Sequence, residues 1–495
     1  MVSQTLRAGF SYLQVLLFMK SNLTVAGTIL IIILLQLFVA LFNDGFVLIH
    51  DEAMWQYIGR NWFRNGLVPY TGGIDNKSPL IFFIFGLSDW LAGVNYWIPR
   101  LLGTVAEAIG IYYLFKIANY YAGRKAGIIA ITLYGLSLLW RSTGGKLVSF
   151  TETYATLFII LSFYHYLTAQ NSRKYFISGL LAGLGCGFRL SALFGTTAIL
   201  VACFKRDFLS AILFIAGWLT ALAALVLLAG AAGIHLNDLV YYTFSDNFGA
   251  GSTTDHSLVW KLESFFNGFF YSEIVLFYPF IAAYFFIKRE IDAPGWWLIF
   301  TVIGISAIGI YAHPHFKEVL PAFSLTSAIA IVYLVNEYNI PFKPTVWIIW
   351  ICFFPKFLEP IVALKKLISG KKQHLEAICQ AQQSNEEAEK ELGIWIKYHT
   401  DKKALVYVAG YGARVQAYSE RMSPTIFFNV TQTKGAKERL YKDLSNNNPQ
   451  LILIPAFTNY NQFVQPDIRK FIENMVSKEY TFQQCIYGYG IYRRK

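Results

Sequence analysis

The feature that most constrains this chain is the length of its uncharged apolar runs. The 30 residues between Asp207 and Asp238 contain no Asp, Glu, Lys or Arg, and Ser21–Asn43 is a second uncharged stretch. A helix needs about 20 apolar residues to cross the hydrocarbon core of a bilayer. Only 15% of the residues are charged, whereas soluble domains carry about 25% charged residues. The sequence therefore excludes a wholly soluble protein and predicts an α-helical polytopic membrane protein.

Apolar windows predict eleven membrane spans, the first of which is too long for a signal peptide and acts as an anchor. The predicted spans are 23–42, 98–115, 126–140, 152–168, 176–189, 190–204, 209–230, 267–287, 295–311, 317–335 and 345–363. The segment Pro79–Gly93 is apolar but short, so we interpret it as a re-entrant or interfacial helix. Lys356 and Glu359 interrupt the last span; if it does not cross, the C-terminal domain lies inside.

Basic clusters orient these spans, because short cytoplasmic loops carry an excess of Lys and Arg. Without a crossing at Pro79–Gly93, the clusters at 124–125, 173–174, 205–206 and 288–289 share one side with Arg7 and Lys20. This predicts a bacterial-type inner or plasma membrane protein with a cytoplasmic N-terminus. The segments that then lie outside hold most of the unusual polar residues: 43–97, 141–151, the turn around Arg189, 231–266 and 313–317.

The chain changes character after the last predicted span. Residues 364–495 hold 20 Lys and Arg against 12 Asp and Glu, and apolar strands such as Ala404–Val408 and Gln450–Ile454 alternate with helical stretches. This alternation predicts a small extracytoplasmic α/β domain at 364–495, attached to a membrane domain at 1–363. A basic domain on a membrane protein suits lipid headgroups or anionic ligands better than nucleic acid. A plain stabilising role for this domain remains the alternative.

The most distinctive polar segment follows the first span. It runs from His50-Asp51-Glu52 through a Gly66-Leu67-Val68-Pro69-Tyr70 turn to Lys77-Ser78-Pro79-Leu80. An acidic pair alone is also typical of the first turn of a solvated helix. In this order, the segment resembles the first extracytoplasmic loop of GT-C superfamily glycosyltransferases, in the branch similar to aminoarabinose transferases and protein O-mannosyltransferases. Ser78 replaces the Pro or Gly that is usual there.

Three later segments extend the resemblance over most of the chain. They are the glycine-rich stretch Leu180–Leu190 that contains Arg189, His315-Phe316 with the following Leu320-Pro321, and the ending Tyr487–Arg494. The resemblance implies a GT-C-like membrane domain whose first outer loop is 43–97. It also implies an inverting transferase that moves a sugar from a polyprenyl-phosphate donor to a lipid, glycan or protein acceptor hydroxyl at the extracytoplasmic face.

The resemblance also assigns roles to particular residues. Asp51 is the expected general base, with Glu52 beside it, and general-base help is worth about 10²–10⁴-fold. The leaving lipid phosphate needs fixed cations or N–H donors. The expected phosphate-binding residues are Lys77, Arg189, Arg141 and His315, and the expected acceptor or accessory residues are Tyr57, Glu152 and Lys317. A divalent metal near Asp51 or Glu52 is left open, because some relatives use one and others do not.

Several of these residues also have plain structural explanations. Arg189 could snorkel to the headgroups, and Arg141 could anchor the interface beside Trp140. Glu107 lies mid-span, seven residues after Arg100, where a buried structural ion contact is expected. The rival functions are a secondary transporter or lipid flippase, for which no inverted repeat is found, and a non-catalytic scaffold, which would leave Asp51 and Lys77 unexplained.

Overall fold

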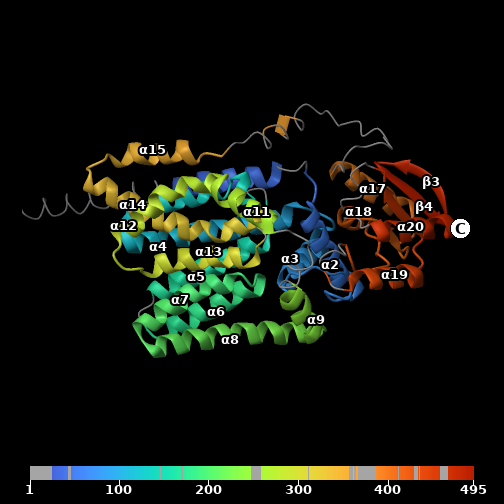
Figure 1. Ribbon diagram of the computed structural model, residues 1–495, viewed down its shortest axis with the longest axis horizontal. Coiled ribbons are helices and arrows are strands. Elements are labelled where there is room, and N and C mark those ends of the chain that lie inside the picture. Colours follow the sequence, from blue (N-terminus) through green and yellow to red (C-terminus); the bar gives the residue numbers. More distant parts are fainter. Residues whose placement is uncertain are drawn as a thin grey trace, which may run out of the picture.

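The computed structural model describes most of the chain and is mainly helical. The described residues are 25–42, 46–144, 147–168, 171–246, 258–309, 311–355, 361, 364–365, 386–410, 412–428, 433, 435–456 and 466–495. The expected basic residues Arg7 and Lys20, and the interrupting residues Lys356 and Glu359, lie outside them. In Figure 1, elongated helices run side by side, and a smaller unit with a sheet lies at one end of this bundle.

The bundle begins with the helix Val25–Phe42. It continues with α2 (His50–Asn65), α3 (Pro79–Ala92), α4 (Trp97–Ser137), the short η2 (Arg141–Thr143), α5 (Thr151–Thr168), α6 (Arg173–Phe188), α7 (Ala192–Arg206) and α8 (Phe208–Ala231). After these come α9 (Leu236–Val240), η3 (Tyr241–Ser245), α11 (Leu258–Phe270), η4 (Glu273–Phe277), α12 (Tyr278–Ile287), α13 (Ala293–Ile308), η5 (His313–Glu318), α14 (Leu320–Glu337) and α15 (Phe342–Phe353). Two predicted spans, 98–115 and 126–140, fall on the single element α4, whose backbone leaves the helical conformation at Ala122 and Gly123.

Among the described residues, four helices are long and apolar enough to cross a membrane, or five if the bent pair Val259–Phe270 and Glu273–Ile287 forms one span. The four are Val25–Phe42, Trp97–Ser137, Phe208–Ala231 and Leu320–Glu337. The helices at the other predicted spans are shorter or less apolar. The segment Pro79–Ala92 is a 14-residue helix, which is short for a crossing that needs about 20 residues.

Glycines allow α6 and α8 to pack in direct backbone contact. A Cβ atom on Gly179 would lie 2.0 Å from the carbonyl oxygen of Phe214, and one on Gly217 would lie 2.0 Å from that of Phe176. Small residues at such crossings let membrane helices approach closely. Within the glycine-rich stretch before Arg189, a Cβ atom on Gly183 would lie 2.7 Å from the carbonyl oxygen of Trp218, so this glycine has the same packing function.

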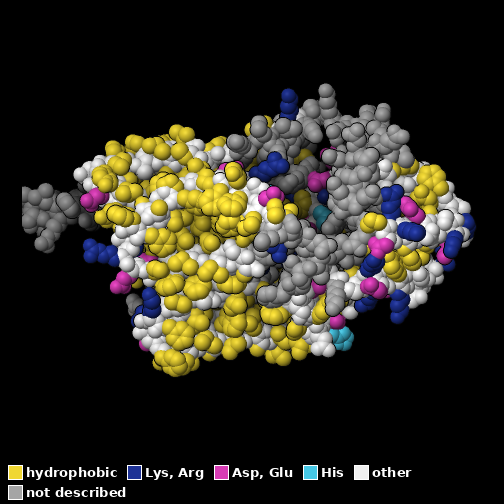
Figure 2. All heavy atoms as spheres, in the orientation of Figure 1, with side chains coloured by type: hydrophobic (Ala, Val, Ile, Leu, Met, Phe, Trp, Pro, Cys, Tyr) yellow, Lys and Arg dark blue, Asp and Glu magenta, His cyan; other side chains and the backbone are white. Residues whose placement is uncertain are grey.

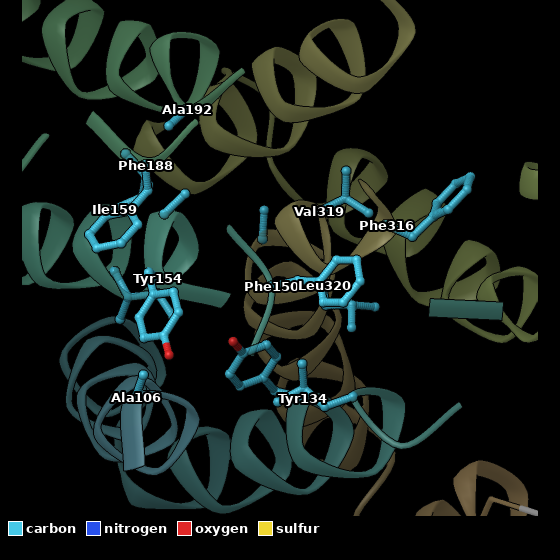
Figure 3. Packing of buried hydrophobic residues seen from close by; sticks show 14 of the residues in the cluster. Ala106, Tyr134, Phe150, Tyr154, Ile159, Phe188, Ala192, Phe316, Val319 and Leu320 are labelled. Carbon is cyan, nitrogen blue, oxygen red and sulfur yellow. The ribbon is translucent and has the colours of Figure 1, made fainter. Parts of the chain in front are cut away.

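The core of the bundle combines aromatic and aliphatic side chains from helices far apart in the sequence. Figure 3 shows Tyr134 of α4 and Tyr154 of α5 directed into this interior, together with Phe188 and Leu320. Tyr154 and Phe188 stack with ring centroids 5.0 Å apart. On the face seen in Figure 2, the surface of the bundle is mostly apolar, and charged side chains are more frequent over the sheet-containing unit. An apolar exterior of this kind is what a lipid-facing bundle requires.

The sheet-containing unit begins in the described residues with α17 (Glu386–His399). Its other elements are β1 (Val406–Val408), α18 (Ala413–Ser419), α19 (Ala436–Asn447), β2 (Leu451–Pro455), α20 (Pro466–Glu479), β3 (Tyr480–Ile486) and β4 (Tyr489–Arg494). The strand order is β1-β2-β4-β3, and β1 pairs with β2 in parallel while the other pairs are antiparallel. Its own apolar core includes Leu392, Leu440 and Ile472.

One cysteine of this unit differs from those of the bundle. Cys485 in β3 is disulfide-bonded, whereas Cys186, Cys203 and Cys352 are free thiols. The fifth cysteine of the chain, Cys379, lies outside the described residues. Disulfides persist mainly in oxidising compartments, so the disulfide at Cys485 bears on the location of this unit.

Candidate active site

Asp51 lies in the first turn of α2, directly after the chain leaves the first long helix. Its side chain is partly buried, and it makes no hydrogen bond or ion pair with another described side chain. Burial, the largest cause, and the Asp75 carboxylate together raise the pKa of Asp51 to about 6, against the lowering effect of the Lys77 ammonium. Asp51 is therefore a carboxylate that can exchange a proton near neutral pH.

Glu52, the next residue, is fully enclosed by structural partners. Its Oε2 lies 2.8 Å from Arg100 Nη2, and its Oε1 accepts hydrogen bonds from Arg100 Nε at 3.1 Å and Ser149 Oγ at 2.6 Å. Arg100 also donates to the carbonyl oxygens of Ala40 and Val47. Both members of the pair are at most 1% exposed. The sequence placed Glu52 beside the base as a catalytic residue, but here its charge is committed to holding α2 against α4.

Lys77 is presented by the turn that precedes α3. Tyr70 Oη donates to the Lys77 carbonyl oxygen at 2.7 Å, which explains how the Gly-x-x-Pro-Tyr turn fixes this segment. Ser78 caps α3 through Leu80 N, and Pro79 occupies its first turn, as both residues favour. Lys77 Nζ donates to Asn76 Oδ1 at 2.7 Å, and within the described residues it has no carboxylate partner.

Arg189 ends α6 and connects three of the predicted outer segments. Its Nη1 lies 2.7 Å from Glu152 Oε1, and its Nε lies 2.6 Å from Glu318 Oε1. Ser191 Oγ donates to the same Glu318 oxygen at 2.7 Å. His315 Nε2 lies 3.9 Å from Glu152 Oε1. Arg189, Glu152 and His315 thus lie together in a buried network that also contains Glu318.

Lys317 and Arg141 occupy different environments from this network. Lys317 Nζ lies 2.8 Å from Glu107 Oε1, and it also donates to the Leu147 carbonyl oxygen and Thr153 Oγ1. Lys317 is 1% exposed, and it forms the buried ion contact that was expected for Glu107. The partner is Lys317 and not Arg100. Arg141 is exposed at the start of η2.

Electrostatic effects link the first loop to this network. The carboxylate of Glu152 raises the pKa of Asp51, so the α5 terminus lies within electrostatic range of the predicted base. Asp75 Oδ2 accepts a hydrogen bond from Trp55 Nε1 at 2.6 Å, which fixes a second carboxylate on the same loop. Asp51, Asp75, Lys77 and the Glu152–Arg189 pair therefore form one polar site at the end of the bundle.

Tyr57, an expected acceptor or accessory residue, lies where α2 contacts the sheet-containing unit. It is 2% exposed, and its Oη accepts a hydrogen bond from the Ser423 N–H at 2.8 Å. The ring of Phe428 meets its edge with centroids 5.0 Å apart. Tyr57 therefore connects α2 to the sheet-containing unit.

Sequence reasoning missed several members of the site. Arg100 was mentioned only beside Glu107, and Asp75 was given no role. Glu318 and Ser149 were not considered. The available signal for Glu318 was its position directly after Lys317 at the predicted outer end of a span, since an ionisable residue there marks a functional or paired site. Among the described residues, no three His, Cys, Asp or Glu side chains form a group that could hold a metal ion.

Comparisons with known proteins agree with this architecture. Residues 76–231 match the family model for dolichyl-phosphate-mannose-protein mannosyltransferase, which is less than half of the chain. None of the curated proteins matches in sequence. ArnT from Cupriavidus metallidurans bound to undecaprenyl phosphate has a TM-score of 0.64 and 13% identity, over 95% of this chain and 98% of that chain. The predicted resemblance to the GT-C superfamily is confirmed.

A second GT-C structure extends the comparison. The oligosaccharyltransferase of Archaeoglobus fulgidus, in complex with Zn and sulfate, has a TM-score of 0.55 and 13% identity, over 94% of this chain and 73% of that chain. At 13% identity these likenesses show a shared GT-C fold. The family-model match begins one residue before Lys77 and ends with α8, so it includes Glu152 and Arg189 but starts after Asp51.

Proposed function

We propose that this protein is an inverting glycosyltransferase that moves a sugar from a polyprenyl-phosphate donor to an acceptor hydroxyl at the extracytoplasmic membrane face. The observation that carries the proposal is that one loop presents a carboxylate and a cation, neither of which has an ion-pair partner among the described residues. Asp51 is a carboxylate with no hydrogen-bonding partner among the described residues, and Lys77 is a cation with no carboxylate partner there. A base and a phosphate-binding cation are the two groups that this reaction needs.

The chemistry follows from these two groups. Asp51 accepts the proton of the acceptor hydroxyl while the hydroxyl oxygen forms its bond to the anomeric carbon. The bond between that carbon and the phosphate oxygen breaks, and its electron pair stays on the lipid phosphate. A single displacement inverts the anomeric centre, and it needs one base and no protein nucleophile. With a pKa of about 6, Asp51 is mostly ionised at neutral pH and still basic enough to take a proton.

The remaining residues support this step. Lys77 offsets the charge that develops on the leaving phosphate, and the relative ArnT was solved with undecaprenyl phosphate bound. Arg189 shares its charge between Glu152 and Glu318, so we propose that it orders the phosphate end of the site and reaches the phosphate together with His315. Arg141 lies at the exposed rim, where it can attract the anionic headgroup. Glu52 positions α2 through Arg100 and does not transfer a proton.

We also propose the eleven-span topology, with the membrane domain at 1–363 and the domain at 364–495 on the extracytoplasmic side. Two observations support this arrangement. Tyr57 contacts Ser423, so the sheet-containing unit shares a face with the first outer loop. The disulfide at Cys485 favours an oxidising compartment for that unit. The acceptor, whether lipid, glycan or protein, approaches from this side.

The proposal is tested with purified full-length protein in lipid and a panel of synthetic polyprenyl-phosphate sugars, with a cell-envelope extract as the acceptor source. Release of polyprenyl phosphate is followed for the wild type, for Asp51→Asn, and for Asp238→Asn as a matched control on the exposed helix α9. We expect one donor to be consumed, with loss of turnover in Asp51→Asn and normal turnover in Asp238→Asn. If no donor is consumed by folded protein, and flux of a lipid or solute is found instead, the transporter or flippase interpretation replaces this one.

A further inference from the structure

The backbone just before the predicted base is held by side chains from the far end of the chain. The Leu48 N–H donates to Tyr418 Oη at 3.0 Å, and Arg414 Nε donates to the Leu48 carbonyl oxygen at 2.8 Å. Leu48 is fully buried and lies three residues before Asp51. Both backbone polar groups of Leu48 are therefore hydrogen-bonded by α18 of the sheet-containing unit, more than 360 residues away in sequence.

Arg414 is itself fixed by a dedicated set of partners. Its guanidinium forms ion pairs with Glu389, and with Glu386 at 3.3 Å, both on α17. Tyr489 Oη of β4 donates to Glu389 at 3.1 Å. Arg414 and Glu389 are about 5% exposed. An arginine that is buried and held from several sides has little freedom to move, so it is a rigid support for Leu48.

Two further contacts hold the same loop beyond Asp51. Tyr57 accepts the Ser423 N–H six residues after the predicted base. The Ile74 N–H donates to the Ile426 carbonyl oxygen at 2.9 Å, and Ile74 directly precedes Asp75 in the segment that carries Lys77. The segments that contain Asp51 and Lys77 are thus each in contact with residues 414–426 (Figure 1 shows α18 beside α2).

The segment before Asp51 is held by the bundle as well as by the sheet-containing unit. From the bundle side, Arg100 binds Glu52 and the Val47 carbonyl oxygen. From the outer side, Arg414 and Tyr418 bind Leu48. The loop before Asp51 is therefore held between two buried arginines, one from each unit. Burial beside the Arg414 guanidinium also lowers the pKa of His50 to about 3, so the residue preceding Asp51 adds no charge at neutral pH.

We propose that Arg414 and Tyr418 are positioning residues, through which the C-terminal unit sets the place of the Asp51 carboxylate for proton transfer. This inference rests on the proposed glycosyltransferase function. Its physical basis is that a misplacement of about 1 Å at a reacting group can cost on the order of 10²-fold in rate. It assigns the C-terminal unit a part in the reaction beyond plain stabilisation.

The test compares variants of these residues with a matched arginine of the same unit. Arg421 is also buried, but its hydrogen bonds go to Thr400, Lys397 and Ser419 within the C-terminal unit. Arg414→Ala, Tyr418→Phe and Arg421→Ala are prepared as full-length proteins in lipid. Tyr418→Phe removes one hydrogen-bonding group and keeps the ring, so it remains informative if Arg414→Ala fails to fold.

Two readouts separate positioning from stability. The first is the kcat and KM of donor turnover, where Arg414→Ala and Tyr418→Phe are expected to lower kcat by about 10- to 100-fold with little change in donor KM. The second is hydrogen exchange of a peptide covering 46–57, which should quicken in these two variants and not in Arg421→Ala. The second readout needs no enzymatic activity.

The outcomes are distinct. Quickened exchange at 46–57 in a protein that turns over no donor keeps the contact between the units but removes the proposed function and, with it, a role in proton transfer. Exchange and kcat that match Arg421→Ala in both variants would overturn the positioning role while leaving the glycosyltransferase function in place.

Discussion

The raised pKa of Asp51 predicts the pH at which activity is lost on acidification. A base works only when ionised, and an aspartate with its ordinary pKa of 3.8 is almost fully ionised at pH 5. Burial and Asp75 raise the pKa of Asp51 to about 6. The ionised fraction then falls from about 90% at pH 7 to about 10% at pH 5. We therefore expect kcat/KM to fall about tenfold over this interval.

The neighbours of Asp51 give the direction of two further shifts. Asp75 raises the pKa of Asp51, so Asp75→Asn should move the fall in activity at acidic pH, the acid limb of the pH profile, to lower pH. Lys77 lowers that pKa, so Lys77→Ala should move the limb to higher pH, in addition to weakening donor use. His50 does not produce a limb near pH 6, because its pKa is lowered to about 3. His315→Asn tests an imidazole origin of the limb: loss of the limb in that variant would assign it to His315 and not to Asp51.

The assay is the initial rate of polyprenyl-phosphate release at low donor concentration, from pH 4.5 to pH 8, with protein folding checked at each pH. The reasoning is refuted if the wild-type rate is constant between pH 7 and pH 5. It is also refuted if Asp75→Asn and Lys77→Ala move the limb in the same direction, because their charges act oppositely on Asp51.

Three other predictions follow from the buried and bonded groups. Glu52→Gln should destabilise the protein by about 3–5 kcal/mol, because it leaves Arg100 buried without its counter-ion; chemical unfolding in detergent measures this, with Arg469→Gln at an exposed pair expected to cost under about 1 kcal/mol. Lys77→Ala should weaken binding of a polyprenyl phosphate but not of the uncharged polyprenol, as measured by calorimetry; equal loss for both lipids would contradict the phosphate assignment. Denatured, unreduced protein should show fewer free thiols than the five cysteines of the chain, and reduction should expose all five; five thiols without reduction would contradict the disulfide at Cys485.

The general class of the fold could be predicted from the sequence, because long uncharged runs admit few structures. Most of the run between Asp207 and Asp238 forms the single helix α8, Phe208–Ala231. The motif Gly66–Tyr70 was recognised as a turn. The structure shows what this turn does, because Tyr70 Oη donates a hydrogen bond to the Lys77 carbonyl oxygen. The two apolar windows 98–115 and 126–140 were separated in the sequence, and the helical conformation of α4 is interrupted between them at Ala122 and Gly123.

The partners of the site residues could not be predicted from one sequence. Glu52 and Asp51 are adjacent, yet the helix turns their side chains to different faces, and only the packing of α4 decides that Glu52 meets Arg100. Lys317 was named as an acceptor or accessory residue, and the sequence did not show that its ammonium pairs with Glu107 of α4. The contact of Arg414 with Leu48 joins residues 366 positions apart, and no local pattern encodes such a pairing.

The most direct test of the central claim measures binding and turnover separately in Asp51→Asn. With the donor identified, the account predicts that this variant binds the donor with nearly the wild-type affinity, because Lys77 is unchanged. Its single-turnover rate of sugar transfer should be lower by about 10²–10⁴-fold. A single-turnover rate close to that of the wild type would contradict the assignment of Asp51 as the base.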